Sequence, residues 1–406
     1  MYDWAILMEW VEFAVRWLHV ITAIAWIGSS FYFIALDLGL HRDRDLASGA
    51  DGEEWQVHGG GFYHVQKYLV APDRMPGDLV WFKWESYATW LSGAALLMLV
   101  YWLGAEFYLI DPTVMDLAIW QAVGISAASL ALGWVIYDQL CKSPLGQHTT
   151  GLMVLLFGVL VAMSWFYAQV FSGRAALLHL GAFTATIMSA NVFFIIMPNQ
   201  RIVVADLKAG QVPDAKYGVI AKQRSTHNNY LTLPVIFLML SNHYPLATST
   251  QYNWIIASLV FLMGVTIRHY FNTMHARKGR PNWTWAATAV IFLLIAWLSV
   301  APGPTHETAM TRGAERFAAT DGFDEVHRIV TGRCSMCHAE EPVWPGLYWA
   351  PKGVILETPE QVAMAAKGVA MQSGWSHAMP PGNLSFMTED ERALIRSWYR
   401  TVRSGF

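Results

Sequence analysis

Residues 175–197 read AALLHLGAFTATIMSANVFFIIM, a run without a single Asp, Glu, Lys or Arg. An apolar helix of about 20 residues can cross the ~30 Å hydrocarbon core of a bilayer. Comparable runs recur at residues 10–38, 81–103, 116–137, 151–171, 231–247, 254–271 and 283–301. The pattern predicts an all-α, polytopic membrane bundle of about eight spans. The run 231–247 is the weakest because it is short and contains Pro234, so seven or nine spans stay open.

The composition supports the same class. The 406 residues are 54% hydrophobic and only 14% charged, and 20 of them are Trp. Soluble proteins carry about 25% charged residues. The sequence therefore predicts a multi-pass protein in contact with membrane lipid. The net charge of -3 gives no sign of nucleic-acid binding.

Lysine and arginine gather in alternate loops. The loops after spans one, three, five and seven hold Arg42, Arg44, Lys67, Arg74, Lys83, Lys142, Arg201, Lys208, Lys216, Lys222, Arg224, Arg268, Arg277, Lys278 and Arg280, whereas the other loops hold only Arg174. By the positive-inside rule the first set faces the cytoplasm. Both termini are then expected on the opposite side of the membrane.

Spans one and five share a pattern at an offset of 160 residues. Trp17-Leu18-His19 matches Leu177-Leu178-His179, and further matches follow along both spans. The repeat predicts a duplication of four spans in parallel orientation, 4+4. Chance matching between apolar helices is the alternative.

The run Cys334-Ser335-Met336-Cys337-His338 has the C-x-x-C-H spacing of c-type haem attachment. Two thioether bonds would use Cys334 and Cys337, and His338 would bind the iron. A zinc site would need a second ligand pair, and a dithiol motif would not explain His338. Covalent attachment takes place outside the cytoplasm in bacteria, which agrees with the charge pattern and predicts a periplasmic haem on the inner membrane.

The second axial ligand is expected downstream of the motif. Met379 lies in a loop rich in Pro and Gly, which could hold its thioether against the iron. Met364, Met371 and Met387 are alternative ligands, although core packing accounts for them more simply.

A helix is predicted on each side of this haem site. Residues 323–333 lead into the motif, and Thr388 and Glu391 form a capping box for a helix that buries Leu394, Ile395 and Trp398. This is the pattern of a class I cytochrome c domain. We therefore divide the chain into a transmembrane domain (1–302), a linker (303–310) and a cytochrome c domain (311–406).

Two histidines lie inside apolar spans, where polar groups are costly and often functional. His19 and His179 are expected at equivalent depths, and both are candidates to ligate a second haem, of b type. The alternative is that each imidazole bonds to a neighbouring helix.

A polar cluster enters span six from the cytoplasmic side. It comprises Arg224, His227, Asn228, Asn229 and Tyr230, and Glu85 opens span two nearby in the expected topology. Dense donors and acceptors of this kind suit a planar polar heterocycle. Interfacial aromatic residues and the positive-inside rule explain part of the cluster without a ligand.

Three segments carry a resemblance to a known family. HGGGFYHVQKYLVAP (58–72), WFKWESYATWLSG (81–93) and STHNNYLTLPVIFLMLSNHYP (225–245) closely resemble the membrane-bound urate hydroxylases, urate oxidases linked to a fused cytochrome c. The resemblance covers essentially the whole chain. RWLHVITAIAWIGSSFYF (16–33) also looks like the first helix of the membrane protoporphyrinogen oxidases, which implies haem binding for His19 only.

The resemblance implies oxidation of urate to 5-hydroxyisourate in purine breakdown, with electrons passing to the c haem and then to a downstream cytochrome c or terminal oxidase. No hydrogen peroxide is expected. Within this reading we expect Arg224, His227, Asn228, Asn229 and Tyr230 to bind urate. Glu85 or His227 would be the base that activates water.

Two other functions fit the same sequence. A membrane cytochrome that takes electrons from quinol would need no urate site, and a transporter or channel with an attached redox sensor would move solute without net oxidation. Reduction of the haem by urate in the purified protein distinguishes all three.

Overall fold

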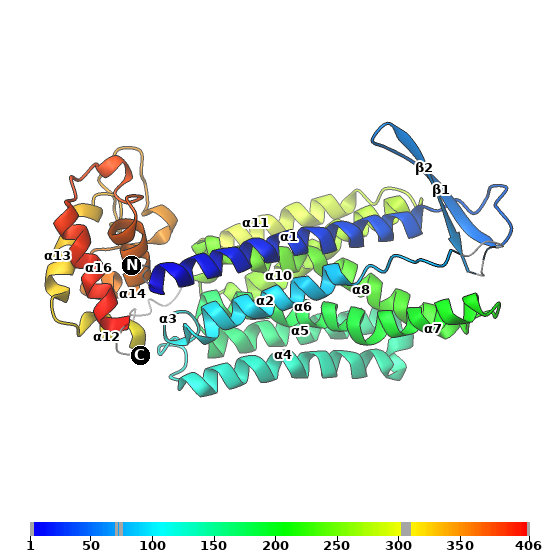
Figure 1. Cartoon of the computed structure of the whole chain (residues 1–406), viewed down its shortest axis with the longest axis horizontal. Coiled ribbons are helices and arrows are strands. Elements are labelled where there is room, and N and C mark those ends of the chain that lie inside the picture. Colours follow the sequence, from blue (N-terminus) through cyan, green and yellow to red (C-terminus); the bar gives the residue numbers. More distant parts are fainter. Residues whose placement is uncertain (1–3, 70–71, 73–75, 302–309, 404–406) are drawn as a thin grey trace.

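The computed structural model describes residues 4–69, 72, 76–301 and 310–403. Helices dominate these residues, and Figure 1 shows a bundle of long, roughly parallel helices with a smaller group of helices at one end. The predicted linker, 303–310, lies outside the described residues apart from Met310.

The long helices of the bundle are α1 (Trp4–Gly39), α4 (Ile119–Lys142), α5 (Thr149–Val170), α6 (Gly173–Ala190), α8 (Ala215–Leu240), α10 (Asn253–His275) and α11 (Trp283–Val300). Shorter elements complete it: α2 (Trp84–Leu96), η1 (Leu97–Trp102), α3 (Ala105–Tyr108), η2 (Pro144–Gln147), η3 (Asn191–Ile196), α7 (Met197–Lys208), η4 (Ser241–His243) and α9 (Pro245–Thr248). The π-helical turns η1 and η3 continue α2 and α6 without a break.

Among the described residues, six helices are long and apolar enough to cross a membrane. Each of these helices overlaps one of the predicted spans. Six of the predicted spans are thereby confirmed as helices of membrane-spanning length. The predicted spans 81–103 and 231–247 are helical, as α2 with η1 and as the second half of α8. Neither is among the six, because the Trp84–Trp102 helix begins with polar residues and the first half of α8 is charged.

Helix α8 passes through Pro234 without ending there. Its neighbour α10 places Gly264 against the proline ring, where an added Cβ would lie 2.5 Å from the proline Cδ. The glycine therefore lets α10 pack closely at the point where Pro234 removes a backbone hydrogen bond.

The prediction of an all-α fold is wrong for the loop after α1, which contains two β-strands. They form an antiparallel hairpin, β1 (Ala50–His58) and β2 (Gly61–Tyr68), which projects from the far end of the bundle in Figure 1. Gly59 and Gly60 both have positive φ, of 60° and 81°, as a two-residue hairpin turn requires. Gly59 and Gly60 thus form the turn of the hairpin.

The C-terminal helices have a core of their own. They are α12 (Arg312–Ala318), α13 (Phe323–Cys334), η5 (Pro351–Gly353), α14 (Pro359–Met364), α15 (Ala366–Val369), η6 (Ala370–Trp375), η7 (Pro381–Asn383) and α16 (Glu389–Arg403). Ile395 and Trp398 are buried there, as expected from their spacing. The predicted capping box is confirmed, since Thr388 N donates to Glu391 Oε2 at 2.6 Å and Glu391 N donates to Thr388 Oγ1 at 3.2 Å.

This C-terminal unit packs on the end of the bundle opposite the hairpin. Phe317 of α12 meets Phe107 of α3, with ring centroids 5.9 Å apart, and Arg316 donates to Glu106 at 2.8 Å. Helix α1 begins at the same end in Figure 1, so the two ends of the described chain lie together, as the prediction of one shared side requires.

Candidate functional site

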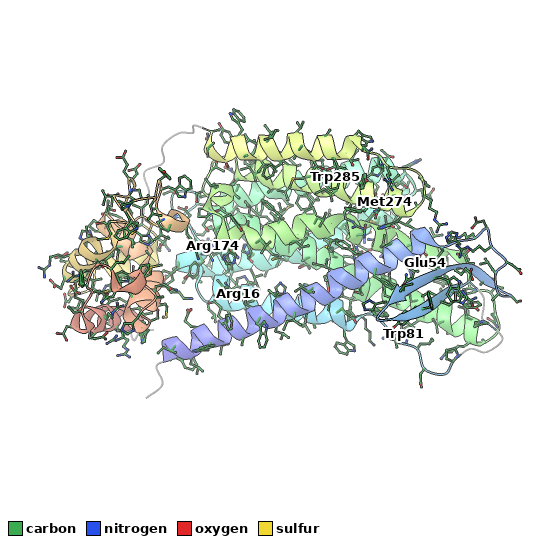
Figure 2. All side chains as sticks on the ribbon, turned by 90° about the horizontal axis from the view of Figure 1, so that it is seen from above. Arg16, Glu54, Trp81, Arg174, Met274 and Trp285 are labelled. Carbon is green, nitrogen blue, oxygen red and sulfur yellow. The ribbon has the colours of Figure 1, made fainter. Side chains whose placement is uncertain are left out.

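A cavity of about 270 Å³ opens between α1, η3, α7, α8 and the segment before α2. Trp81, which lines it, lies at the hairpin end of the bundle in Figure 2, far from Arg16 and Arg174, which lie towards the C-terminal helices. Its polar lining residues are Ser29, Ser30, Gln200, Ser225, Asn228 and Thr232, and its aromatic ones are Trp26, Phe33, Trp81 and Phe82. Aromatic faces combined with hydrogen-bonding groups suit a flat polar ligand.

Asn228 is the predicted site residue that lines this cavity. Its Oδ1 accepts from Asn191 Nδ2 at 2.9 Å, and its Nδ2 donates to the Met188 carbonyl at 2.9 Å. Two bonds to different groups fix the orientation of the amide. The amide is therefore held in place before any ligand arrives.

Arg224 is buried and precedes Ser225, which lines the cavity. Its Nη2 donates to Asp138 Oδ1 of α4 at 2.8 Å, and its guanidinium carbon lies 4.9 Å from the centroid of the Tyr137 ring. A carboxylate partner thus neutralises the charge that the sequence suggested for ligand binding. Arg224 is placed to support the site and does not line the cavity.

His227 belongs to a buried chain of hydrogen bonds. Asn191 Nδ2 donates to the Tyr137 hydroxyl at 3.0 Å, and that hydroxyl lies 2.8 Å from His227 Nδ1. Because Asn191 donates to the Tyr137 hydroxyl oxygen, the hydroxyl can donate its own proton to His227 Nδ1. His227 and Tyr230 line a second, apolar cavity of about 60 Å³ next to Tyr137. Tyr137 and His227 could move or hold a proton between α4 and α8.

Asn229 faces a different group of residues from its neighbour Asn228. Its Oδ1 accepts from Arg268 Nε and Nη2, both at 3.2 Å, and from Asn272 Nδ2 at 3.0 Å. Its own Nδ2 is buried and has no partner among the described residues. Arg268 and Asn272 come from α10 and extend the polar network across the bundle.

Glu85 is separate from these groups. It opens α2, and its Oε2 is buried without a hydrogen-bond partner among the described residues. No described contact joins it to His227 or to Asn228. The structure therefore brings together the cluster on α8 but leaves Glu85 outside it.

The C-x-x-C-H motif begins at the last residue of α13, Cys334. The backbone turns back on itself there, with Cys337 N and His338 N both donating to the Cys334 carbonyl, at 3.2 and 2.9 Å. His338 Nδ1 donates to the Val354 carbonyl at 2.8 Å, which leaves Nε2 as the nitrogen that could bind a metal. Burial raises the pKa of the Cys334 thiol to about 11. These residues fit haem attachment.

Met379 lies on a loop held by a buried arginine. Arg392 Nη1 donates to the carbonyls of Ser373 at 2.6 Å and Met379 at 3.0 Å, and Met379 N donates to Gln372 O at 2.9 Å. Met387 is buried in the C-terminal core, as a packing residue would be. The loop is therefore well fixed, which an axial ligand requires.

His19 and His179 differ in their surroundings. His19 Nδ1 donates to the Thr89 carbonyl at 3.1 Å, and its Nε2 has no hydrogen bond among the described residues, the pattern of a metal-binding histidine. His179 is fully buried, with Nδ1 donating to the Ala175 carbonyl and Nε2 accepting from Ser126 Oγ, both at 2.8 Å. Iron ligation by His179 would require one of these bonds to break.

In the described part of the chain, no three His, Cys, Asp or Glu side chains come together as a metal site. A haem bound through His338 and Met379 would have one histidine and one methionine as ligands to its iron. Such a site does not need a cluster of three His, Cys, Asp or Glu side chains. His19 is packed closely against α2, since an added Cβ on Gly93 would lie 2.9 Å from its ring.

Sequence reasoning missed several members of the polar network: Tyr137, Asp138, Asn191, Arg268 and Asn272. Each is polar within or at the end of an apolar helix, and such residues are commonly functional. Arg268 was explained by the positive-inside rule, which concealed its burial inside the bundle.

The fold and the site define a class: a polytopic membrane bundle that encloses a polar network next to a cavity lined by aromatic and polar groups. The sequence profile of the family described as urate oxidase N-terminal matches residues 5–299. The chain belongs to this urate oxidase family. Neither the curated proteins nor the solved structures contain a match to it.

Proposed function

We propose that this protein is a membrane-bound urate oxidoreductase that converts urate to 5-hydroxyisourate and passes the electrons to a c-type haem in the same chain. The observation that carries the proposal is the family match across the bundle, which includes every residue that lines the cavity. Urate is flat and has both N–H donors and carbonyl acceptors. A cavity that combines aromatic faces with a fixed amide supports binding of such a molecule.

Asn228 and Ser225 would bind the polar edge of urate, while Trp81 and Phe33 would pack against its faces. The orientation of Asn228 is set by Asn191 and by the Met188 carbonyl, so little order is lost when the substrate binds. Such pre-organisation places the C5 atom of the substrate in a constant position relative to the proton-handling groups.

The reaction takes urate and one water to 5-hydroxyisourate, two electrons and two protons. The His227–Tyr137 pair can accept a proton, because Asn191 orients the Tyr137 hydroxyl towards the imidazole. Glu85 is the other candidate base, and its Oε2 is buried without a partner among the described residues. Arg224 would hold this region in place through Asp138.

A haem held by Cys334, Cys337, His338 and Met379 would supply one-electron redox chemistry at the far end of the bundle. The route from the cavity crosses most of the membrane. Along α1 the distance from Ser29 to His19 is about 15 Å and from His19 to Glu12 about 10 Å, at 1.5 Å per residue. His19 therefore lies between the two ends, which supports a b-type haem there. His179 is the less suitable second ligand because both its nitrogens are bonded.

The protein would lie in the inner membrane of a bacterium, with its C-terminal unit in the periplasm. There the unit would pass electrons to a downstream cytochrome c or terminal oxidase. Because oxygen is not the acceptor at the cavity, no peroxide is formed in this step. The concentration of Lys and Arg in the loops after spans one, three, five and seven supports this orientation.

Anaerobic addition of urate to the oxidised, purified protein tests the proposal. Urate absorbance should fall and the c haem should become reduced. Asn228→Ala should slow this reduction by about tenfold or more, the loss expected for a buried hydrogen bond of ~1–3 kcal/mol. Asn282→Ala, which changes an exposed asparagine, is the matched control and should have no effect.

Dithionite should reduce the haem equally in all these proteins. The proposal fails if urate leaves the haem oxidised in the presence of an added electron acceptor. Reduction by quinol alone would identify an electron-transfer protein without urate activity.

A further inference from the structure

Arg268 lies inside the bundle with only 5% of its surface exposed. Its guanidinium donates to Asn229 Oδ1 through Nε and Nη2, both at 3.2 Å, and to Asn272 Oδ1 through Nη2 at 3.0 Å. The guanidinium carbon also lies 4.1 Å from the centroid of the Phe31 ring. The arginine is thus well hydrogen-bonded, and its hydrogen-bond partners are neutral amides.

No Asp or Glu in the described part of the chain forms an ion pair with Arg268. Arg224 provides the contrast, because Asp138 neutralises it at 2.8 Å. A buried charge without a counter-charge is costly, since the interior of a membrane bundle solvates ions poorly. The Arg268 charge therefore favours a negative charge that binds close by.

A second observation points the same way. The Nδ2 group of Asn229 is fully buried and finds no acceptor among the described residues, although its Oδ1 accepts three bonds. An orphaned donor beside an unneutralised cation marks a region short of negative charge.

This region adjoins residues that line the cavity. Asn229 follows Asn228 on α8, and Phe31 follows Ser30 on α1, and both Asn228 and Ser30 line the cavity. Arg268 itself does not line the cavity, but it contacts Asn229 and Phe31, each of which is the chain neighbour of a lining residue. The field of a charge falls off slowly in a low-dielectric interior, so it can act on a ligand that the arginine does not touch.

We propose that Arg268, positioned by Asn229 and Asn272, makes the cavity selective for an anionic substrate over a neutral one of the same shape. This inference rests on the proposed function and names the ionic form of urate, the monoanion, that the site takes. Arg268 acts through its field and does not contact the substrate, so it determines specificity without taking part in the chemistry.

The test compares urate with xanthine, which lacks one oxygen, in a mildly acidic buffer where urate is an anion and xanthine is neutral. Dissociation constants are measured by calorimetry with the full-length protein. Arg268→Gln should weaken urate binding by about tenfold, equivalent to ~1.4 kcal/mol. Xanthine affinity should change by less than about twofold, because no charge is lost from its interaction.

Asn272→Asp is the sharper variant because it keeps the arginine and nearly the same shape. It places a carboxylate next to Arg268 Nη2, which now bonds to the Asn272 Oδ1 at 3.0 Å. The ion pair should cancel the field and reproduce the loss of urate affinity. Arg268→Lys should retain the preference for urate, and Arg280→Gln, which removes an exposed arginine, should leave both affinities unchanged.

Equal weakening of urate and xanthine in Asn272→Asp would overturn the inference, because it would show a structural role only. The same holds if Asn272→Asp leaves urate affinity unchanged. If Arg268→Gln does not fold, as judged by elution profile, Asn272→Asp decides the matter alone. Failure of the proposed function looks different, since the wild-type protein would then bind neither purine.

Discussion

Lys367 of the C-terminal unit places its Nζ 2.5 Å from Glu9 Oε1 near the start of α1, and 3.1 Å from Glu12 Oε2. This contact joins residues from opposite ends of the chain. All three side chains are partly buried, with exposed fractions of 30%, 36% and 20%. The pairs therefore help to fix the C-terminal unit on the bundle, where an electron acceptor would need to be.

Replacing Lys367 by Met should weaken this docking. We expect a fall of roughly 1 kcal/mol in the stability of the contact, since the ions are partly solvated. Differential scanning calorimetry should show a lower unfolding temperature than for the wild type, and the difference should shrink at high salt. Lys278→Met, at an exposed site, is the control. A difference that does not depend on salt would point to lost packing instead of lost charge.

The same contact should resist alkaline pH. Burial acts to lower the pKa of Lys367, but the Tyr108, Glu9 and Glu12 groups raise it more, so the pKa lies above the usual lysine range. A raised pKa gives stability that is complete below the unfolded value and is lost only as the pH rises through the folded value. The stability difference between wild type and Lys367→Met should therefore be constant from neutral pH to about pH 10. A decline near pH 8 would contradict this.

Asp138 should be essential for the stability of the bundle. Removing it by Asp138→Ala leaves Arg224 buried without a counter-charge, which costs about 3–5 kcal/mol. Thermal inactivation in detergent should show the loss, and the double variant Asp138→Leu/Arg224→Met should recover most of it. Equal destabilisation by the single and the double variant would show that the hydrogen bonds around Asp138 matter more than its charge.

Local patterns made much of the fold predictable. Continuous apolar runs predicted the six described helices that are long and apolar enough to cross a membrane, and the capping box at Thr388 and Glu391 predicted the start of α16. The hairpin was not predicted, although Gly59-Gly60 between alternating residues is a hairpin signal. Its polar and aromatic residues also lacked the apolar face of a buried sheet.

The site was less predictable because its contacts join separate helices. Arg224 and Asp138 lie 86 positions apart, and Arg268 and Asn229 lie 39 apart. Helical periodicity shows which residues share a face but not which face meets which helix. The cluster on α8 was recognised, but the sequence could not reveal that Arg224 is neutralised while Arg268 is not.

Covalent haem attachment is tested by Cys337→Ala. We expect the wild-type protein to retain haem in a denaturing gel, and Cys337→Ala to lose most of that stain, because one of its two thioether bonds cannot form. Cys141→Ala should keep the full stain, since that buried cysteine of α4 belongs to no haem motif. Haem that can be extracted completely from the wild type would exclude a c-type site.

Met379→Ala should keep the covalent haem but lower its reduction potential, because a thioether ligand favours the ferrous iron. Potentiometric titration of the haem absorbance measures the shift. Arg392 holds the Met379 carbonyl at 3.0 Å, so Arg392→Met should displace the same loop and shift the potential in the same direction, though it also removes buried hydrogen bonds. Met364→Ala is the matched control, since Met364 packs against the C-terminal core. If Met364→Ala lowers the potential and Met379→Ala does not, the ligand assignment moves to Met364.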